Sequence, residues 1–237
     1  MATPDYGLDA PGDVRKLLVR GAVLSALAIV LYIANGPNPV AAIFLSIGIT
    51  FLIVGAVMVW SSRVAKPRMR DRLLDLLPWR GDEKVLDVGC GRGLLLIGAA
   101  KRLKSGRAIG VDIWRAEDLS GNGADATLAN AKAEGVADRI KIESADARKL
   151  PMADATIDTV VSSLVIHNIP SREEREQALS EIARVLKPGG HVAILDILHT
   201  ATYAKELKKR GFTDVNLSRL NLLWCLPTRY VTARKQN

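Results

Sequence analysis

The sequence predicts an α/β fold, a seven-stranded sheet with helices on both faces, preceded by two transmembrane helices. Two observations predict it. An uncharged run of 42 residues, 21–62, lies near the start, and beyond it short aliphatic runs alternate with longer amphipathic ones. Alternating strands and helices are typical of a parallel sheet covered on both faces. We therefore divide the chain into a hairpin segment (1–62), a basic juxtamembrane connector (63–80) and a C-terminal domain (81–237).

The composition of the chain excludes several classes of protein. Of its 237 residues 49% are hydrophobic and only 5% are aromatic, which excludes wholesale disorder and low-complexity tracts. Two cysteines and three histidines, at spacings that match no zinc motif, predict neither a disulfide framework nor a metal site. The net charge of +8 is concentrated in 63–80 and 205–237, a pattern that suits a membrane surface as well as a polynucleotide.

The uncharged run predicts two membrane spans, about 17–35 and 40–60, separated by the turn residues Gly36-Pro37-Asn38-Pro39. A bilayer core requires about 20 apolar residues, a length that both spans approach. Arg and Lys precede the first span and follow the second, so the positive-inside rule places both termini and the C-terminal domain in the cytoplasm. A cleaved signal peptide and a buried helix pair are the alternatives.

Small residues in the first span, Gly21, Ala22, Ser25 and Ala26, allow close helix contact, and a homodimer is left open on that ground. After the second span, 70–77 has helical apolar spacing with charges on the opposite face. This connector helix either packs on the following domain or lies on anionic lipid.

The elements of the C-terminal domain follow from its hydrophobic periods. The expected strands are 84–88, 107–111, 140–144, 156–162, 191–196, 215–219 and 230–234, and the expected helices are 94–103, 123–134, 172–186 and 201–210. A parallel sheet binds its ligands at the carboxyl ends of its strands. We therefore look for site residues where each of these strands ends.

The first strand runs into a glycine-rich loop with Asp87, Gly89, Gly91 and Gly93, where glycines permit a sharp turn and close approach of a ligand. The loop matches neither the dinucleotide fingerprint nor the phosphate-binding loop.

Polar residues end the next three strands. Asp112 ends the second strand, where a carboxylate can accept both hydroxyls of a ribose. Asp146 ends the third strand within reach of an adenine amino group, and Ser162 ends the fourth.

These motifs, in this order, resemble the class I S-adenosylmethionine-dependent methyltransferases of the small-molecule type that includes the ubiquinone and menaquinone methylases. The resemblance covers roughly 70–234 and is carried by 85–93, Asp112, Asp146-Ala147 and 186–190. It implies a Rossmann-like sheet and S-adenosylmethionine as cofactor. It also implies roles for individual residues: the glycines line the methionine part, Asp112 holds the ribose, and Ile113 and Ala147 lie beside the adenine. Asp87 acts through a bound water or toward the amino group, and the alternative for it is a buried acid that caps the loop.

A general base is needed only if the acceptor must lose a proton. His167 follows the fourth strand, and His199 follows the fifth together with Asp196, so these three are the candidate catalytic residues. The alternative for the histidines is a solvated or helix-capping role.

The acceptor is open to several hypotheses. Short connections between the late strands leave little material for a lid, which favours a hydrophobic acceptor reached from the membrane, such as a quinol, a phospholipid amine, or an apolar thiol or phenol. A tethered enzyme acting on a soluble, nucleic-acid or protein acceptor is an alternative, although no nucleic-acid-binding motif is found and no nucleic-acid partner is expected. A non-catalytic cofactor-binding scaffold is the other.

Overall fold

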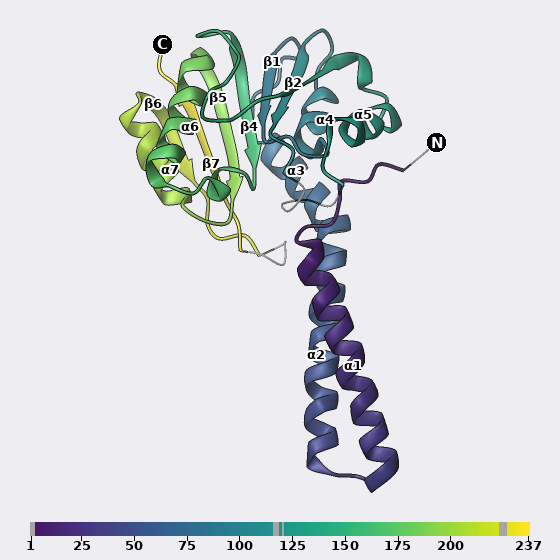
Figure 1. Cartoon of the computed structure of the whole chain (residues 1–237). Helices are drawn as coiled ribbons and strands as arrows, with labels where there is room; N and C mark the ends of the chain where they lie inside the picture. Colours follow the sequence, from purple (N-terminus) through teal and green to yellow (C-terminus); the bar gives the residue numbers. More distant parts are fainter. Residues whose placement is uncertain (1–2, 116–118, 120, 223–226) are drawn as a thin grey trace.

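The computed structural model describes residues 3–115, 119, 121–222 and 227–237 of the chain and has two parts, a long helical hairpin and an α/β domain (Figure 1). The figure shows the hairpin extending from one end of the domain. Trp224 and Cys225, for which the sequence favours packing roles, lie outside the described residues.

The hairpin consists of α1 (Pro11–Asn35) and α2 (Pro39–Trp60), which contain the two predicted spans. The turn between them has the predicted chemistry. Gly36 adopts a φ of 72°, and the Asn38 side chain caps α2 by accepting a hydrogen bond of 2.8 Å from the Ala41 amide. Both helices are long and apolar enough to cross a membrane.

Small residues bring α1 and α2 into close contact. The buried positions recur every seven residues, at Val14, Gly21 and Ala28 in α1 and at Ala41, Gly48 and Gly55 in α2. This is the repeat of two helices that wind around each other. A Cβ on Gly21 would lie 2.9 Å from the Gly48 carbonyl oxygen, so side chains larger than hydrogen do not fit there. The small residues of the first span were the ground for a possible homodimer. Two of them, Gly21 and Ser25, face α2 of the same chain.

We expect Gly48→Ala to weaken the packing of the hairpin. The added methyl group would lie 2.5 Å from the Ser25 hydroxyl, and overpacking of this kind costs about 1–3 kcal/mol. Thermal unfolding of the full chain in detergent measures the loss. Gly12→Ala is the matched control, since its Cβ meets nothing within 4 Å. Equal stability of the two variants would contradict the contact.

The predicted connector begins as a helical extension of the hairpin. The helix of α2 continues through a π-helical segment, Ser61–Ala65, into α3 (Lys66–Leu74). Met69, Leu73 and Leu74 are fully buried in the core of the domain. Of the two roles left open for the connector helix, the structure therefore shows packing on the domain.

The domain contains the predicted seven strands in the order β3-β2-β1-β4-β5-β7-β6. Their bounds are β1 Lys84–Val88, β2 Arg107–Asp112, β3 Ile140–Ser144, β4 Ile157–Ser163, β5 Leu186–Asp196, β6 Phe212–Leu217 and β7 Arg229–Lys235. The prediction of a wholly parallel sheet is wrong at β7, which pairs antiparallel with both β5 and β6. No helix separates β6 from β7 among the described residues, and strands joined without a crossover run antiparallel.

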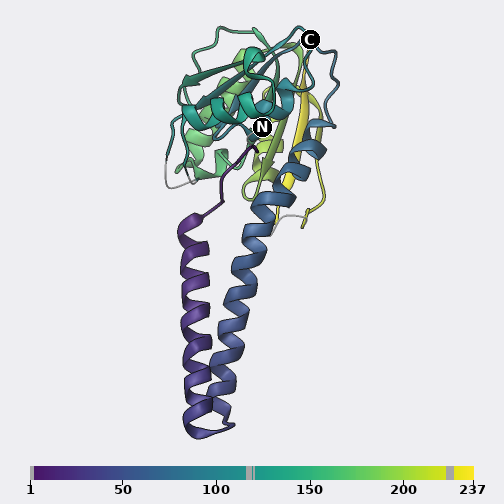
Figure 2. The ribbon, with the colours of Figure 1, turned by 90° about the vertical axis from the view of Figure 1, so that its right-hand side faces the viewer.

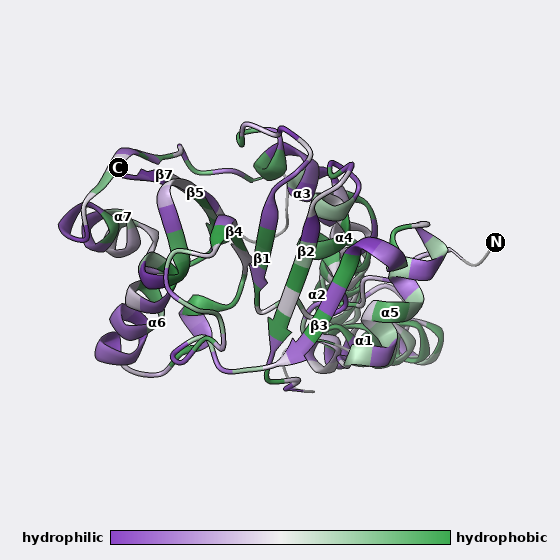
Figure 3. Ribbon diagram, turned by 90° about the horizontal axis from the view of Figure 1, so that it is seen from above, coloured by the Kyte–Doolittle hydropathy of each residue, from purple (hydrophilic) through white to green (hydrophobic). Residues whose placement is uncertain are grey.

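Helices cover both faces of the sheet, as predicted. Their bounds are α4 Leu94–Ala100, α5 Ala124–Ala133, α6 Arg172–Val185 and α7 Thr200–Lys209, with short 3-10 turns at Ala137–Arg139 and Ile166–Asn168. One core packs under α3, α4 and α5 and the other under α6 and α7. Adjacent residues of β1 serve different cores, Val85 the first and Leu86 the second, because side chains alternate along a strand. In Figure 3 most of β2 is hydrophobic, whereas α6 and α7 are mostly hydrophilic.

The carboxyl edge of the parallel strands faces the hairpin. Figures 1 and 2 show β4 descending toward the end of the domain from which α1 and α2 extend. The N-terminal segment before α1 returns to this edge, where Asp5 and Asn130 exchange two hydrogen bonds of 2.8 Å. The ligand-binding edge of the sheet and the two ends of the hairpin are therefore neighbours.

Candidate active site

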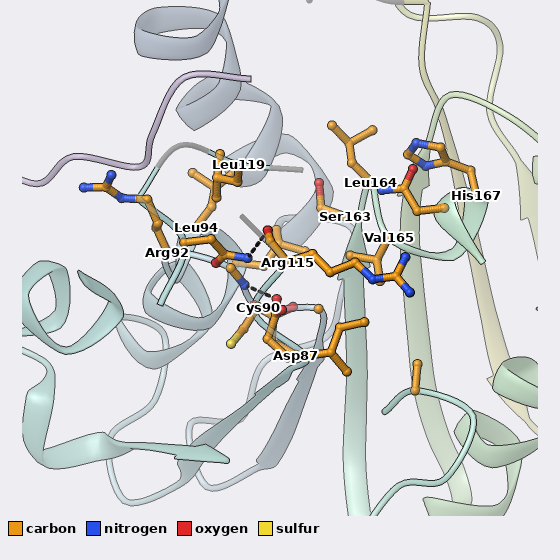
Figure 4. Close-up of a pocket in the computed structure, with 18 of the residues that line it drawn as sticks. Asp87, Cys90, Arg92, Leu94, Arg115, Leu119, Ser163, Leu164, Val165 and His167 are labelled. Atoms are coloured by element: carbon orange, nitrogen blue, oxygen red, sulfur yellow. Dashed lines mark hydrogen bonds between the residues drawn. The ribbon is translucent and has the colours of Figure 1, made fainter. Parts of the chain in front are cut away.

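A cavity of about 370 Å³ lies at the carboxyl edge of the sheet (Figure 4). Its walls come from the loops after β1, β2, β3, β4 and β5 and from the two ends of the hairpin. Eight of the predicted site residues line it: Asp87, Gly89, Gly91, Asp112, Ile113, Asp146, Ala147 and His167.

The glycine-rich loop after β1 is fixed by backbone hydrogen bonds. The amides of Gly89 and Cys90 both donate to the Val111 carbonyl oxygen, at 2.8 and 3.0 Å. Gly89 has a φ of 72°, and a Cβ there would lie 2.1 Å from Val165 Cγ2. The backbone of the loop is therefore packed against the loop after β4 with no space for a side chain.

Asp87 is buried beneath this loop with half of its carboxyl group unpartnered. Its Oδ2 accepts a 2.7 Å hydrogen bond from the Leu96 amide, while its Oδ1 has no hydrogen-bond partner. Burial, helped by the nearby charge of Asp112, raises the pKa of Asp87 to about 8. A buried carboxyl group that lines a cavity and lacks a donor is suited to receive a cationic ligand group.

Asp112, at the end of β2, has one backbone donor on each oxygen. The Gly91 amide donates to Oδ2 at 2.8 Å, and the Trp114 amide donates to Oδ1 at 2.7 Å. Each carboxylate oxygen has a second lone pair that can accept another hydrogen bond. The carboxylate is thus held rigidly and can still accept two hydroxyl groups from a ligand in the cavity.

Asp146, which follows β3, is paired with an arginine. Arg148 Nε donates to both carboxylate oxygens at 3.0 Å, and its Nη2 lies 2.6 Å from Oδ2. The hydrogen bond from Arg148 lowers the pKa of Asp146, so this carboxyl group is ionised at neutral pH. Arg148 also pairs with Glu174.

His167 lines the cavity, with Asp196 behind it. Its Nδ1 lies 2.5 Å from Asp196 Oδ1, off the direction of a linear hydrogen bond. Two lone pairs would repel at this distance, so we assign a proton to Nδ1 and leave Nε2 as the basic nitrogen. Asp196 is 1% exposed and accepts from the Tyr203 hydroxyl at 3.2 Å and the Ile197 amide at 2.8 Å. Asp196 therefore contacts His167 from behind and lies outside the described cavity lining.

Four predicted site residues do not line the cavity: Asp196, which lies behind His167, and three others. Ser162 is fully buried and donates to the Val88 carbonyl oxygen at 2.8 Å, while the next residue, Ser163, lines the cavity. Gly93 permits helix packing, because a Cβ there would lie 2.9 Å from both Ile97 and Thr127. His199 precedes α7, is exposed, and lies outside the described cavity lining.

The structure adds cavity residues that the sequence analysis missed. Asp9 and Lys66 lie at the two ends of the hairpin and form a partly buried ion pair of 2.6 Å. Tyr6 also lines the wall, and its hydroxyl donates to Glu134 at 2.9 Å. In Figure 4 the side chain of Arg115 extends across the cavity toward Val165. No local motif marks these residues, because their contacts join segments far apart in the chain.

Known proteins match the part of the chain that builds this cavity. Residues 86–194 match the family model described as "Methyltransferase domain". These residues form a methyltransferase domain.

Two curated relatives of the methyltransferase domain are the methyltransferase GfsG of Streptomyces halstedii and the ubiquinone/menaquinone biosynthesis C-methyltransferase UbiE of Roseobacter denitrificans. GfsG is 34% identical over 138 residues, 58% of this chain and 46% of the relative. UbiE is 32% identical over 127 residues, 54% of this chain and 47% of the relative. The chain thus spans about half the length of the curated relatives that it matches.

A crystal structure of a SAM-dependent methyltransferase from Aquifex aeolicus has the same fold. It superposes with a TM-score of 0.58 at 17% identity, covering 76% of this chain and 97% of that one.

S-adenosylmethionine is the methyl donor of the methyltransferase domain, and the cavity fits it. The unpartnered Oδ1 of Asp87 suits an ammonium group, and the absence of a Cβ at Gly89 keeps the loop close-packed. The rigid carboxylate of Asp112 suits ribose hydroxyls. When bound, S-adenosylmethionine supplies an electrophilic methyl group on a sulfonium.

We expect the affinity for S-adenosylmethionine to rise with pH up to about pH 8. Below the pKa of Asp87, about 8, its carboxyl group must lose a proton to pair with the ammonium group, so the Kd should increase about tenfold for each pH unit below it. Calorimetric titrations in buffers of different ionisation enthalpy would detect the released proton. Asp87→Asn should bind more weakly and without this slope. The same slope in that variant would contradict the assignment.

Proposed function

We propose that the full chain is a membrane-anchored, S-adenosylmethionine-dependent methyltransferase that acts on a hydrophobic small molecule taken from the bilayer. One observation carries the proposal. The cavity wall includes Asp9 and Ala10, directly before α1, and Lys66, which begins the helix continuous with α2. If the hairpin spans the bilayer, the cavity therefore lies at the membrane surface.

The exposed apolar surface of the hairpin supports the membrane anchor. Only 11% of the most apolar stretch of each helix is buried, and side chains such as Val23, Val30 and Ile33 are 60%, 60% and 77% exposed. A helix pair from a soluble core would be covered by protein, whereas a bilayer covers such a surface. The packing of Asp5 and Tyr6 on the domain argues against removal of the first span as a signal peptide.

Exposed cations support the topology with both termini in the cytoplasm. Arg15, Lys16 and Arg20 near the start of α1, and Arg63 and Arg68 beyond α2, are exposed at the same end of the hairpin. Such residues favour the cytoplasmic side of a membrane. Lys66, by contrast, is buried against Asp9 and does not add to the exposed positive charge at this end of the hairpin.

The arrangement at His167 favours an acceptor that loses a proton, such as a quinol or phenol. His167 Nε2 takes the hydroxyl proton, and the buried carboxylate of Asp196 stabilises the imidazolium that results. The hydroxyl of Tyr203 holds Asp196 in place. Loss of the proton makes the acceptor electron-rich at its oxygen and at a conjugated carbon. Either atom can then receive the methyl group. The relative UbiE is a C-methyltransferase of ubiquinone and menaquinone biosynthesis, and a quinol-like acceptor agrees with this chemistry.

Transfer of radiolabel tests the proposal. The full chain, reconstituted in vesicles, is incubated with methyl-labelled S-adenosylmethionine and separate lipid and aqueous extracts of the source cell. We expect label in the organic phase, and we expect His167→Ala to abolish most of it. Label confined to small aqueous products would make the hairpin a simple tether. No transfer to either extract, with cofactor binding intact, would favour the scaffold role.

A further inference from the structure

An apolar rim lies on the same edge of the domain as the cavity. Among the described residues outside the hairpin, six large hydrophobic side chains are exposed: Leu76, Ile113, Leu128, Leu198, Leu220 and Leu222. Three of these, Leu198, Leu220 and Leu222, are 54%, 52% and 71% exposed and follow β5 or β6. We call these three leucines the apolar rim.

The sheet topology places the apolar rim at the carboxyl edge. Strand β7 runs antiparallel to both β5 and β6, so β5 and β6 run in the same direction and end at the same edge. That edge also holds the cavity. Figures 1 and 2 agree that the described parts of the connection between β6 and β7 reach toward the end of the domain from which the hairpin extends.

Hydrogen bonds tie this connection to the helix that continues from the second span. Asn221, between two leucines of the apolar rim, donates to the Tyr230 hydroxyl at 3.4 Å. The Tyr230 hydroxyl in turn lies 3.2 Å from Met69 Sδ in α3. Met69 is less than one helical turn beyond Lys66, which lines the cavity. These contacts hold the connection that carries the apolar rim against the helix that continues from the hairpin.

The charge around the apolar rim suits an anionic surface. Residues 215–237 contain no Asp or Glu, and Arg219, directly before Leu220, is exposed. Arg63 and Arg68, on the helix beside this edge, are exposed as well. Exposed leucines beside arginines are typical of surfaces that lie in the headgroup region of anionic membranes.

We propose that the apolar rim inserts into the headgroup region of an anionic phospholipid bilayer. It forms a second membrane contact that holds the mouth of the cavity on the lipid surface, so that an acceptor enters without crossing water. This inference rests on the proposed membrane anchor, and it adds a contact made by the methyltransferase domain itself.

A fluorescent probe on single cysteines of the full chain tests the proposal. Cys225→Ser removes one native thiol, and Cys90 is buried. Leu222→Cys then carries a polarity-sensitive probe in vesicles of phosphatidylcholine and phosphatidylglycerol, some of whose lipids bear a spin label near the headgroup and others a spin label on the acyl chain, which reaches the middle of a span. Ile47→Cys, in α2, reports on the hairpin. Leu76→Cys is the control, an exposed leucine (53%, against 71% for Leu222) near the amino end of β1.

We expect the spin-labelled lipids to quench the probes at residues 47 and 222 and to leave the probe at residue 76 bright. Quenching at 47 but not at 222 would overturn the apolar rim while the anchor stands. Loss of quenching at 47 would overturn the membrane anchor and the rim together. Binding of S-adenosylmethionine with the affinity of the unmodified chain shows that each variant is folded.

Discussion

Gly89→Ala should abolish binding of S-adenosylmethionine. The new methyl group would lie 2.1 Å from Val165 Cγ2 and 2.5 Å from Cγ1, in a loop whose amides are fixed to Val111. Overpacking costs about 1–3 kcal/mol, and the left-handed backbone adds about 1–2 kcal/mol. The loop must shift to relieve the contact, and this shift displaces the cavity wall beside Asp87.

Gly135→Ala is the matched control for backbone strain. Gly135 has a φ of 70°, close to the 72° of Gly89, but a Cβ there meets nothing within 4 Å. Gly135→Ala should lower the free energy of unfolding only by the cost of the left-handed backbone, and it should bind the cofactor normally. Val165→Ala in the Gly89→Ala background should restore part of the affinity. Calorimetry measures all of these variants, and normal binding by Gly89→Ala would show that the loop is not close-packed as described.

His167→Ala should lower kcat by about 10²–10⁴-fold, the usual contribution of a general base. The Kd for S-adenosylmethionine should not change, because the candidate cofactor contacts come from Asp87 and Asp112 instead. Asp196→Asn should also slow transfer, since it removes the buried carboxylate charge that lies against His167 Nδ1. Single-turnover rates and cofactor titrations separate these effects.

His199→Ala distinguishes the two histidines that follow neighbouring strands. His199 is exposed and lies outside the described cavity lining, so we expect this variant to retain the parent rate. A large loss in His199→Ala, with normal transfer by His167→Ala, would reverse the assignment of the base. A small loss in both would mean that the acceptor needs no base, as for an amine.

The sequence by itself determined the class of the fold and much of the cavity. Strands of period two and helices of period 3.6 are local patterns, so the predicted β1 (84–88) and β3 (140–144) coincide with the observed strands. The uncharged run predicted the two helices of the hairpin, because a stretch of apolar residues is also a local pattern. Asp87, Asp112 and Asp146 could be placed at the cavity because the carboxyl ends of parallel strands share one edge.

Only the tertiary structure decided which neighbouring side chain faces the cavity. Alternation along β4 means that Ser162 and Ser163 point in opposite directions, but the pattern does not say which direction is which. The packing of the two cores decides this. Similarly, both His167 and His199 follow strands, and only the former is turned toward the cavity and against Asp196.

Contacts between residues far apart in the sequence decided the N-terminal part of the cavity wall and the place of β7 in the sheet. Asp9 and Lys66 are 57 residues apart, and Asp5 and Asn130 are 125 apart, yet these pairs fix the N-terminal segment as part of the cavity wall. Strand β7 likewise lies between β5 and β6 because of pairing across the sheet. Such contacts depend on surfaces that exist only after folding, so no local period or motif carries them.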